Sequence, residues 1–559
     1  MFRFLHGYWP KVWEAQVNAG LVGENDGIRF CQSLLLPEGA KFNELAAVGG
    51  ELYNIVSQRK CPFYIDRVQG GCYIEDYPYD EKLIATYKEM LGDLFWGLQI
   101  HEWMSNYQYD VYGKLKDLPR EKWTEKEIEE FIFKKYPYPC VFLESATAKE
   151  LAERGRPENL QAFYKNITDI YRKRLQIANL IPCDSACLAY GFEVSAGAKR
   201  IMPEVGAQTG DARIQICYAR GMTRAEGRAF GIYYEPWGGS PFSACCYHKD
   251  NKNEWGIGES ADFPFETQGP NGGSSRSLQK RIFLYGFLSG AEFMSEEWGI
   301  CNTFCDWEQF ELSPYGQVKK EFLDFARKYT DIGEAVVPIA MVLPKDLMVL
   351  DNLYLDDVYC GFRVQSEELA RIKQGIRAVF AQQLPMMGNE TKTLKNSDIP
   401  DAIDLLNEDE AVLDRYDYLI DLTCNPDFAK KHQNLCAIED IKPVLREKLP
   451  CYVEGNAHWL VNQRTTGGYY LTVFNHSGIE RTVAEGEVGL AEAETEVILS
   501  FASGAVPTLC EGDGKLDLTD GQYRLTIPAG GWALIRFADQ GEKQQVSDNL
   551  RKTPNEIRN

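Results

Sequence analysis

The sequence predicts an α/β fold: a (β/α)8 TIM-type barrel followed by a small doubly wound α/β domain and a C-terminal β-sandwich. Residues 1–335 alternate apolar strands with amphipathic helices, which is typical of a parallel sheet covered by helices. A shorter strand–helix region follows, and the chain then changes to alternating apolar and polar segments separated by Gly and Asp, which is typical of a sandwich. A length of 559 residues suits about three domains.

Six strands and five helices are predicted in the barrel. We expect the strands at 28–36, 62–68, 98–103, 200–205, 229–237 and 291–298. The helices carry apolar residues at three- and four-residue spacing and are expected at 43–58, 81–95, 158–178, 211–225 and 275–288. Over this length, six strands favour a closed barrel with some strands unrecognised over an open sheet. The charged stretch 114–135 is interpreted as a solvated helical excursion.

Two domains and a tail are predicted after the barrel. For the α/β domain, residues 336–451, we expect strands at 336–343, 416–422 and 451–453 and helices at 366–383 and 441–448. No Gly-rich phosphate loop follows its first strand, so nucleotide binding is not predicted. The sandwich, residues 452–538, has strands expected at 468–474, 493–501, 522–527 and 532–537. Residues 539–559 are expected to form a polar tail.

Composition argues against several partners and compartments. The net charge of −22 disfavours a nucleic acid or an anionic membrane, because both require clustered Lys and Arg. No apolar run approaches the ~18 residues of a membrane span, and the start MFRFLHGYWPK lacks the apolar core of a signal peptide. The 16 cysteines are scattered through a long chain, so we expect reduced thiols and a cytoplasmic protein.

Common cofactor and nucleophile motifs are absent. The chain has no G-x-x-x-x-G-K-[ST], no H-E-x-x-H and no G-x-S-x-G. The close cysteine groups, such as Cys183 with Cys187, lack the C-x-x-C spacing of a strong zinc site, and only six histidines are present. We therefore predict neither a metal nor a cofactor.

Carboxylates recur where the predicted barrel strands end. They are Asp66, Glu102, Glu204, Glu235, Glu296 and Glu297, and three tryptophans lie close to them in the sequence: Trp103, Trp237 and Trp298. The carboxyl ends of barrel strands carry the active site, because the βα loops meet there. A carboxylate at the end of an apolar strand is costly unless it is paired or has a function. Repetition on five strands therefore indicates a site.

Carboxylates beside aromatic rings are typical of glycoside chemistry. One carboxylic acid protonates the departing oxygen, and a second carboxylate attacks the sugar or activates water. Tryptophan and tyrosine faces, including Tyr234, suit the C–H faces of sugar rings, while carboxylates, Arg67 and His101 suit the hydroxyls. The predicted substrate is a carbohydrate. All of the strand-end residues named here, apart from the catalytic pair, are predicted to bind it.

Glu204 and Glu297 are the predicted catalytic pair. Glu204 ends a strand and faces a turn with Gly206 and Gly210, where a substrate can approach the backbone. Strand alternation sends only one of Glu296 and Glu297 inward, and we favour Glu297. Glu235 is the substitute for either role.

The order of domains resembles that of clan-A glycoside hydrolases, in particular family 42 β-galactosidases. The segments that carry the resemblance are MSEEWGICNTFCDWEQFELSPYGQVKKEF, before the second domain, and LVNQRTTGGYYLTVFNHSG, in the sandwich. The resemblance implies an amidotransferase-like second domain and, by analogy, a dimer or trimer. In the clan, the acid/base follows an Asn on the fourth strand, whereas Glu204 follows Pro203. The resemblance implies Glu204 as acid/base and Glu297 as nucleophile if the strand count fits.

Two other functions remain open on the sequence. A degenerate barrel would give a carbohydrate-binding or assembly protein without catalysis. A metal-dependent enzyme that modifies sugars, such as an isomerase or a deacetylase, would use the same strand ends. Neither the sugar nor the stereochemical outcome follows from the sequence.

Overall fold

The computed structural model describes residues 1–8, 10–31, 48–69, 81–101, 104, 117–122, 124–135, 150–151, 153–179, 181–184, 188–206, 212–225, 227–235, 275–297, 303–305, 308–345, 347, 349–350, 358–359, 363–364, 367–380, 399–482, 486–502 and 504–538. Within these ranges, no helix has the length and apolar character needed to cross a membrane.

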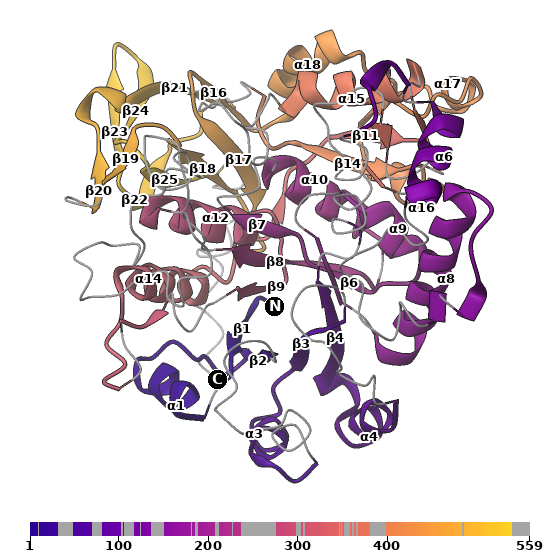
Figure 1. Ribbon diagram of the computed structural model, residues 1–559. Coiled ribbons are helices and arrows are strands. Elements are labelled where there is room, and N and C mark those ends of the chain that lie inside the picture. The colour runs from indigo at the N-terminus through magenta and orange to yellow at the C-terminus, as the bar shows by residue number, and fades with distance from the viewer. Residues whose placement is uncertain are drawn as a thin grey trace, which may run out of the picture.

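The first part of the chain is a closed parallel barrel (Figure 1). Its strands are β1 (Arg3–Gly7), β2 (Gly27–Cys31), β3 (Phe63–Gln69), β4 (Phe95–His101), β5 (Ile181–Cys183), β6 (Arg200–Ile201), β7 (Glu204–Gly206), β8 (Ala229–Glu235) and β9 (Phe293–Glu296). β6 and β7 pair with β8 in one continuous register, so these nine segments make eight barrel strands. Backbone hydrogen bonds from Met202 to Pro182 (3.0 Å) and from Glu204 to Asp184 (3.1 Å) join β5 to this combined strand.

The wall of the barrel has an inner and an outer face. Eight side chains from seven of the eight barrel strands form a separate buried cluster inside: Leu5, Tyr64, Trp96, Ile181, Cys183, Met202, Tyr233 and Phe293. Their neighbours in the sequence, such as Phe4 and Ile65, belong to the larger core outside the wall. Because side chains alternate along a strand, these two clusters fix which residues face the interior.

Helices cover the outside of the barrel. They are α1 (Pro10–Asn18), α3 (Glu51–Arg59), α4 (Glu81–Leu91), α6 (Glu125–Lys135), α8 (Leu160–Ala178), α9 (Tyr190–Ser195), α10 (Ala212–Met222), α12 (Arg276–Leu288) and α14 (Pro314–Lys328). Polar side chains cap three of them: Asn159, Ser275 and Ser313 each accept a hydrogen bond from a backbone N–H in the first turn, at 2.7 to 2.9 Å.

The predicted fold class is confirmed, and β1 and β5 are the two strands that the sequence analysis does not predict. β1 has five residues and includes Arg3 and His6, while β5 has three residues and includes Pro182. Both segments are too short to show a period. The Pro182 carbonyl accepts a hydrogen bond from the neighbouring strand. A proline can accept such a bond, although it has no backbone N–H to donate one.

A small parallel sheet follows, in the order β14 (Ile403–Asn407), β11 (Ile339–Leu343), β15 (Tyr418–Asp421). All five residues of β11 are buried. Helices α15 (Glu367–Phe380), α16 (Glu410–Leu413), α17 (Phe428–Lys431) and α18 (Ile441–Lys448) belong to this region, as does a hairpin of β12 (Val358–Tyr359) and β13 (Arg363–Val364). In Figure 1, the α/β region lies beside α10 of the barrel.

Two antiparallel sheets form the sandwich-like C-terminal region. One has the order β10 (Glu334–Ala335), β17 (His458–Gln463), β18 (Tyr469–Phe474), β25 (Trp532–Phe537), β22 (Thr508–Gly512). The other has the order β16 (Cys451–Glu454), β21 (Thr495–Phe501), β24 (Gln522–Ile527), β23 (Lys515–Thr519), and β19 (Ile479–Thr482) pairs with β20 (Gly486–Gly489). β10 precedes the α/β region in sequence, so the chain contributes to the sandwich before it enters the small parallel sheet.

A buried ionic network joins the barrel to the α/β region. On α10, Arg213 lies 3.0 Å from Asp401, and Arg220 lies 2.5 Å from Asp404. Arg224 contacts the second oxygen of Asp404 at 3.0 Å. The backbones approach closely at Gly221, where a Cβ atom would lie 2.3 Å from the Leu405 carbonyl oxygen.

Candidate functional site

Acidic and basic side chains gather inside the barrel near the carboxyl ends of its strands. We call this set the mouth residues: Arg29 on β2, Asp66 on β3, His101 on β4, Cys183 on β5, Glu204 on β7 and Glu297 directly after β9. Each of them is at least nine-tenths buried. Burial of charge at this depth is unfavourable without partners, so the contacts of each side chain matter.

Glu204 is held by its backbone while its carboxylate faces His101. Its N–H donates to the Asp184 carbonyl, and its own carbonyl accepts a hydrogen bond from the Gln215 side chain at 2.8 Å. The carboxylate Oε1 lies 3.8 Å from His101 Nε2. The backbone is therefore fixed on both sides, and the side chain extends beside an imidazole.

Asp66 is bound by an arginine and a tyrosine. Arg29 Nη1 lies 3.2 Å from Asp66 Oδ2, and the Tyr233 hydroxyl donates to the same oxygen at 3.2 Å. Arg29 also donates to the Tyr233 oxygen at 2.7 Å and to the backbone carbonyl of Glu296. The other oxygen, Asp66 Oδ1, has no hydrogen bond with any described residue. Asp66 is thus held in place with one acceptor oxygen remaining.

Glu296 and Glu297 lie on opposite sides of the barrel wall. Glu296 Oε2 is 2.5 Å from Lys319 Nζ on α14, so this carboxylate is on the outer face in a buried ion pair. Glu297 continues the register, because its N–H donates to the Tyr234 carbonyl at 2.8 Å. Alternation then places Glu297 on the inner face with Phe293 and Ser295, as the sequence analysis favours.

The other residues predicted to bind substrate are placed as follows. Tyr234 packs outside the barrel, edge-on to Phe283 of α12 with ring centroids 5.1 Å apart, so Tyr234 and Glu296 are not brought together with the mouth residues. Arg67 and Glu235 belong to β3 and β8, but their side chains lie outside the described part of the structure. Glu102, Trp103, Trp237 and Trp298 also lie outside the described residues.

The strand count does not meet the condition set by the family resemblance. Glu204 lies on the sixth barrel strand and Glu297 after the eighth, whereas the clan's acid/base lies on the fourth. β4, the fourth strand, ends at His101, and Glu102 follows it in the sequence. Glu204 is on the fourth predicted strand but on the sixth observed strand, because β1 and β5 were not predicted from the sequence. The resemblance therefore assigns no role to Glu204 or Glu297, and any role must follow from their positions.

Two further buried contacts lie near the site, one inside the barrel and one behind β5. The Tyr64 hydroxyl donates to Ser295 Oγ at 2.9 Å; burial, and then the nearby Asp66 carboxylate, raise the pKa of Tyr64 well above its usual range. Behind β5, Glu193 of α9 lies against Asp184. Burial raises the pKa of Glu193 well above its usual range, and the Asp184 carboxylate adds to the effect. Both shifts favour the protonated form of the side chain.

The sequence analysis missed Arg29, Tyr233 and Cys183. Arg29 had a detectable signal, because a cation in the middle of the apolar segment GIRFC is costly unless an anion faces it. Tyr233 and Cys183 had none, because their role depends on which residues lie opposite them on other strands.

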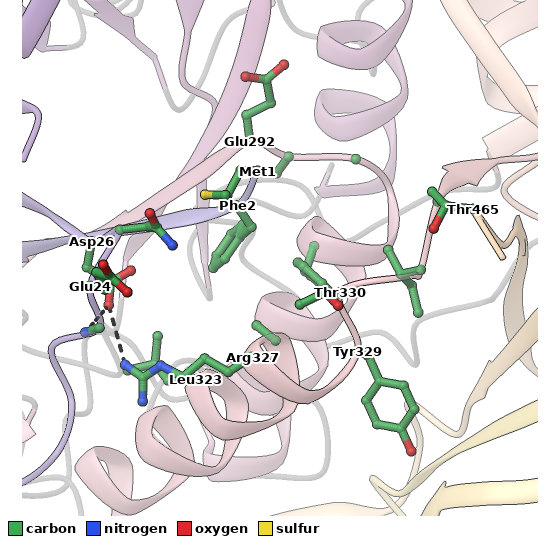
Figure 2. A pocket seen from close by; sticks show the side chains of 18 residues that line it. Met1, Phe2, Glu24, Asp26, Glu292, Leu323, Arg327, Tyr329, Thr330 and Thr465 are labelled. Carbon is green, nitrogen blue, oxygen red and sulfur yellow. Dashed lines mark hydrogen bonds and ion pairs between the residues drawn. The ribbon is translucent and has the colours of Figure 1, made fainter. Parts of the chain in front are cut away.

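A cavity of about 670 Å³ opens at the opposite end of the barrel (Figure 2). It is lined by residues that precede strands, among them Met1, Asp26 and Glu292, and by the end of α14. Asp26 is 3.4 Å from Arg327 and 3.3 Å from His6. Burial alone would raise the pKa of Asp26, but hydrogen bonds from His6 and from two backbone N–H groups lower it to about 2. This end of a barrel is associated with stability rather than catalysis.

Comparisons with known proteins give distant structural similarities. No family model matches the chain, and no curated protein matches its sequence. A β-galactosidase from Halorubrum lacusprofundi is 10% identical, with 96% of this chain and 99% of that chain covered and a TM-score of 0.42. An α-L-fucosidase from Paenibacillus thiaminolyticus is 10% identical, with the same coverage and a TM-score of 0.44. The catalytic module of a family 98 glycoside hydrolase from Streptococcus pneumoniae is 7% identical, with 96% and 98% covered and a TM-score of 0.40. These neighbours are glycoside hydrolases.

Proposed function

We propose that the protein is a glycoside hydrolase that cleaves its substrate at the carboxyl end of the barrel, with Glu204 as general acid and Glu297 as the second carboxylate. The observation that carries this proposal is the placement of both carboxylates on the inner face of strands that border β8. Both side chains are buried, with exposed fractions of 2% and 3%.

The register supports a wide separation of the two carboxyl groups. Glu204 is level with Tyr233 of β8, and Ser295 is level with the same residue from the other side. Glu297 lies two residues further toward the mouth. Two strand spacings of about 4.8 Å and a rise of about 6 Å separate the backbones, and side chains that point to the barrel axis converge. This geometry suits the ~6.5–9.5 Å of inverting enzymes.

The reaction follows from these positions. Glu204 donates its proton to the glycosidic oxygen, and the bond between this oxygen and the anomeric carbon breaks. Glu297 takes a proton from water as the water oxygen bonds to the anomeric carbon. Asp66 Oδ1 accepts a hydrogen bond from a sugar hydroxyl, because Arg29 and Tyr233 occupy only Oδ2. The substrate is a carbohydrate, and the reaction requires no cofactor.

A glycoside panel tests this proposal. The chelator-treated enzyme is assayed with 4-nitrophenyl glycosides of both anomers and with natural oligosaccharides, and NMR records the first anomer released. We expect hydrolysis with inversion, and a loss of at least about 10³-fold in kcat/KM for Glu204→Gln. Absence of hydrolysis across the panel would overturn the proposed function.

A second pair of variants tests the choice of residues. Glu102 follows the fourth strand and Glu235 ends the seventh, so Glu102→Gln and Glu235→Gln are the competing substitutions. Suppose that the wild type hydrolysed a glycoside with retention of configuration, that Glu102→Gln and Glu235→Gln lost this activity, and that Glu204→Gln and Glu297→Gln kept it. The proposed function would then stand, and our catalytic pair would be wrong.

A further inference from the structure

Three mouth residues present different metal-binding atoms toward one point. One donor atom from each of His101, Cys183 and Glu204 lies within 4.8 Å of the other two, and all three residues are buried. The imidazole Nε2 and the carboxylate Oε1 are 3.8 Å apart. Tetrahedral zinc, with bonds of about 2.0 to 2.3 Å, separates its donor atoms by about 3.3 to 3.8 Å. A contraction of at most about 1.5 Å therefore brings these atoms to the required spacing.

The backbone explains why these residues converge. His101 and Cys183 are direct partners in the pairing of β4 with β5. The N–H of Glu204 bonds to the carbonyl of Asp184, the residue after Cys183. Three consecutive barrel strands thus place inward-facing donors side by side. Strands of a closed barrel are rigid supports, which hold metal ligands more accurately than loops do.

We propose that His101, Cys183 and Glu204 form a binding site for a divalent transition metal, with Zn²⁺ as the best fit. One thiolate, one imidazole and one carboxylate are a mixed donor set that suits Zn²⁺, whereas Mg²⁺ and Ca²⁺ take oxygen donors. Three protein ligands leave the fourth tetrahedral position for water or a substrate oxygen, as in catalytic zinc sites. This proposal departs from our prediction that the protein binds no metal.

Metal binding and the proposed hydrolysis both use the Glu204 carboxylate, so the two activities exclude each other. A metal bound to the carboxylate prevents Glu204 from acting as a general acid. Zn²⁺ is therefore expected to inhibit hydrolysis, and chelation is expected to restore it. Binding is measured spectroscopically, so the metal site is tested even if the protein hydrolyses none of the glycosides.

Cobalt titration tests the site directly. The reduced, chelator-treated full-length chain is titrated with Co²⁺, and the sulfur-to-cobalt charge-transfer band is recorded. We expect the band to saturate at one equivalent in the wild type and in Cys61→Ser. Cys61 is a matched control because it is a buried barrel cysteine that precedes β3, at the opposite end of the barrel. Cys183→Ser should abolish the band, and His101→Gln should weaken Co²⁺ binding by at least about 10-fold.

X-ray absorption of the zinc-loaded wild type needs no variant. We expect one sulfur neighbour and two or three nitrogen or oxygen neighbours around each zinc. A wild type without the cobalt band, an undiminished band in Cys183→Ser, or a zinc spectrum with no sulfur or with four sulfurs would overturn the proposal.

Discussion

The barrel mouth and the interface between α10 and β14 both bury acidic side chains, but they neutralise them differently. At the interface, Asp401 is paired with Arg213, and Asp404 is paired with Arg220 and Arg224. The Tyr416 hydroxyl also donates to Asp404, at 2.8 Å. Burial alone would raise the pKa values of both aspartates, but the arginines lower them below the usual range.

At the mouth, the ion pairs that the structure describes are longer than those at the interface. Arg29 contacts Asp66 at 3.2 Å and is shared with Tyr233 and a backbone carbonyl. One basic group beside Glu204 is His101, whose Nε2 lies 3.8 Å from Glu204 Oε1. Buried charge alone therefore does not identify a site. The interface acids are structural, and we propose that the mouth acids meet a ligand.

The largest expected change in stability comes from the interface. Asp404→Asn removes the anion between Arg220 and Arg224 and leaves the buried Arg220 without its carboxylate partner. We expect the free energy of unfolding to fall by about 3–5 kcal/mol, as for other broken buried pairs. Asp427→Asn is the control, because Asp427 forms an exposed pair with Lys430 and should change stability by less than about 1 kcal/mol. Equal effects in urea unfolding would contradict the structural role of the network.

A smaller effect is expected from the mouth cation. Arg29→Lys keeps the charge but cannot reach Tyr233, Asp66 and the Glu296 carbonyl together. We expect a loss of about 1–3 kcal/mol in stability and a higher KM, because Asp66 is no longer held in place. Arg172→Lys, on the exposed face of α8, is the comparison. If Arg29→Lys matched this control in both measurements, Asp66 would not depend on Arg29.

The smallest expected effect comes from Glu193 and depends on pH. Burial and the Asp184 carboxylate raise the pKa of Glu193 in the folded protein. At pH values between the unfolded and the folded pKa, the folded protein therefore keeps a proton that the unfolded chain has lost. This contribution makes the protein less stable as pH rises above about 4.3, the usual Glu value, toward the folded pKa. Glu193→Gln should match the wild type at pH 4 and exceed it in Tm by about 1–2 °C at pH 8.

The exposed Glu130→Gln serves as the control for Glu193, because its side chain is 69% exposed beside Lys126. It should show no such pH dependence. A Glu193→Gln variant that is less stable than the wild type at pH 8 would mean that Glu193 is ionised in the folded protein.

The barrel was predictable from the sequence because alternating strands and helices are a local pattern. This pattern was recognisable even though β1 and β5 were not predicted. Alternation is also local, and it predicted that only one of Glu296 and Glu297 faces inward. The partners of these residues were not predictable. That Lys319 pairs with Glu296, that Arg29 meets Asp66, and that Cys183 lies beside His101 depend on contacts between distant segments. A single sequence does not encode such contacts in any short pattern.

Glu296 and Glu297 are adjacent in the sequence but lie on opposite sides of the barrel wall. Their variants therefore give the sharpest test of a hydrolytic role for the carboxylates inside the barrel. Glu296→Gln and Glu297→Gln are compared by kcat/KM on a cleaved glycoside and by the free energy of unfolding. We expect Glu297→Gln to lose at least about 10³-fold in kcat/KM with its stability kept. We expect Glu296→Gln to keep kcat/KM within about 10-fold and to lose about 3–5 kcal/mol in stability, because Lys319 stays buried without the Glu296 carboxylate. The reverse pattern, or full activity in both variants, would contradict a hydrolytic role for the carboxylates inside the barrel.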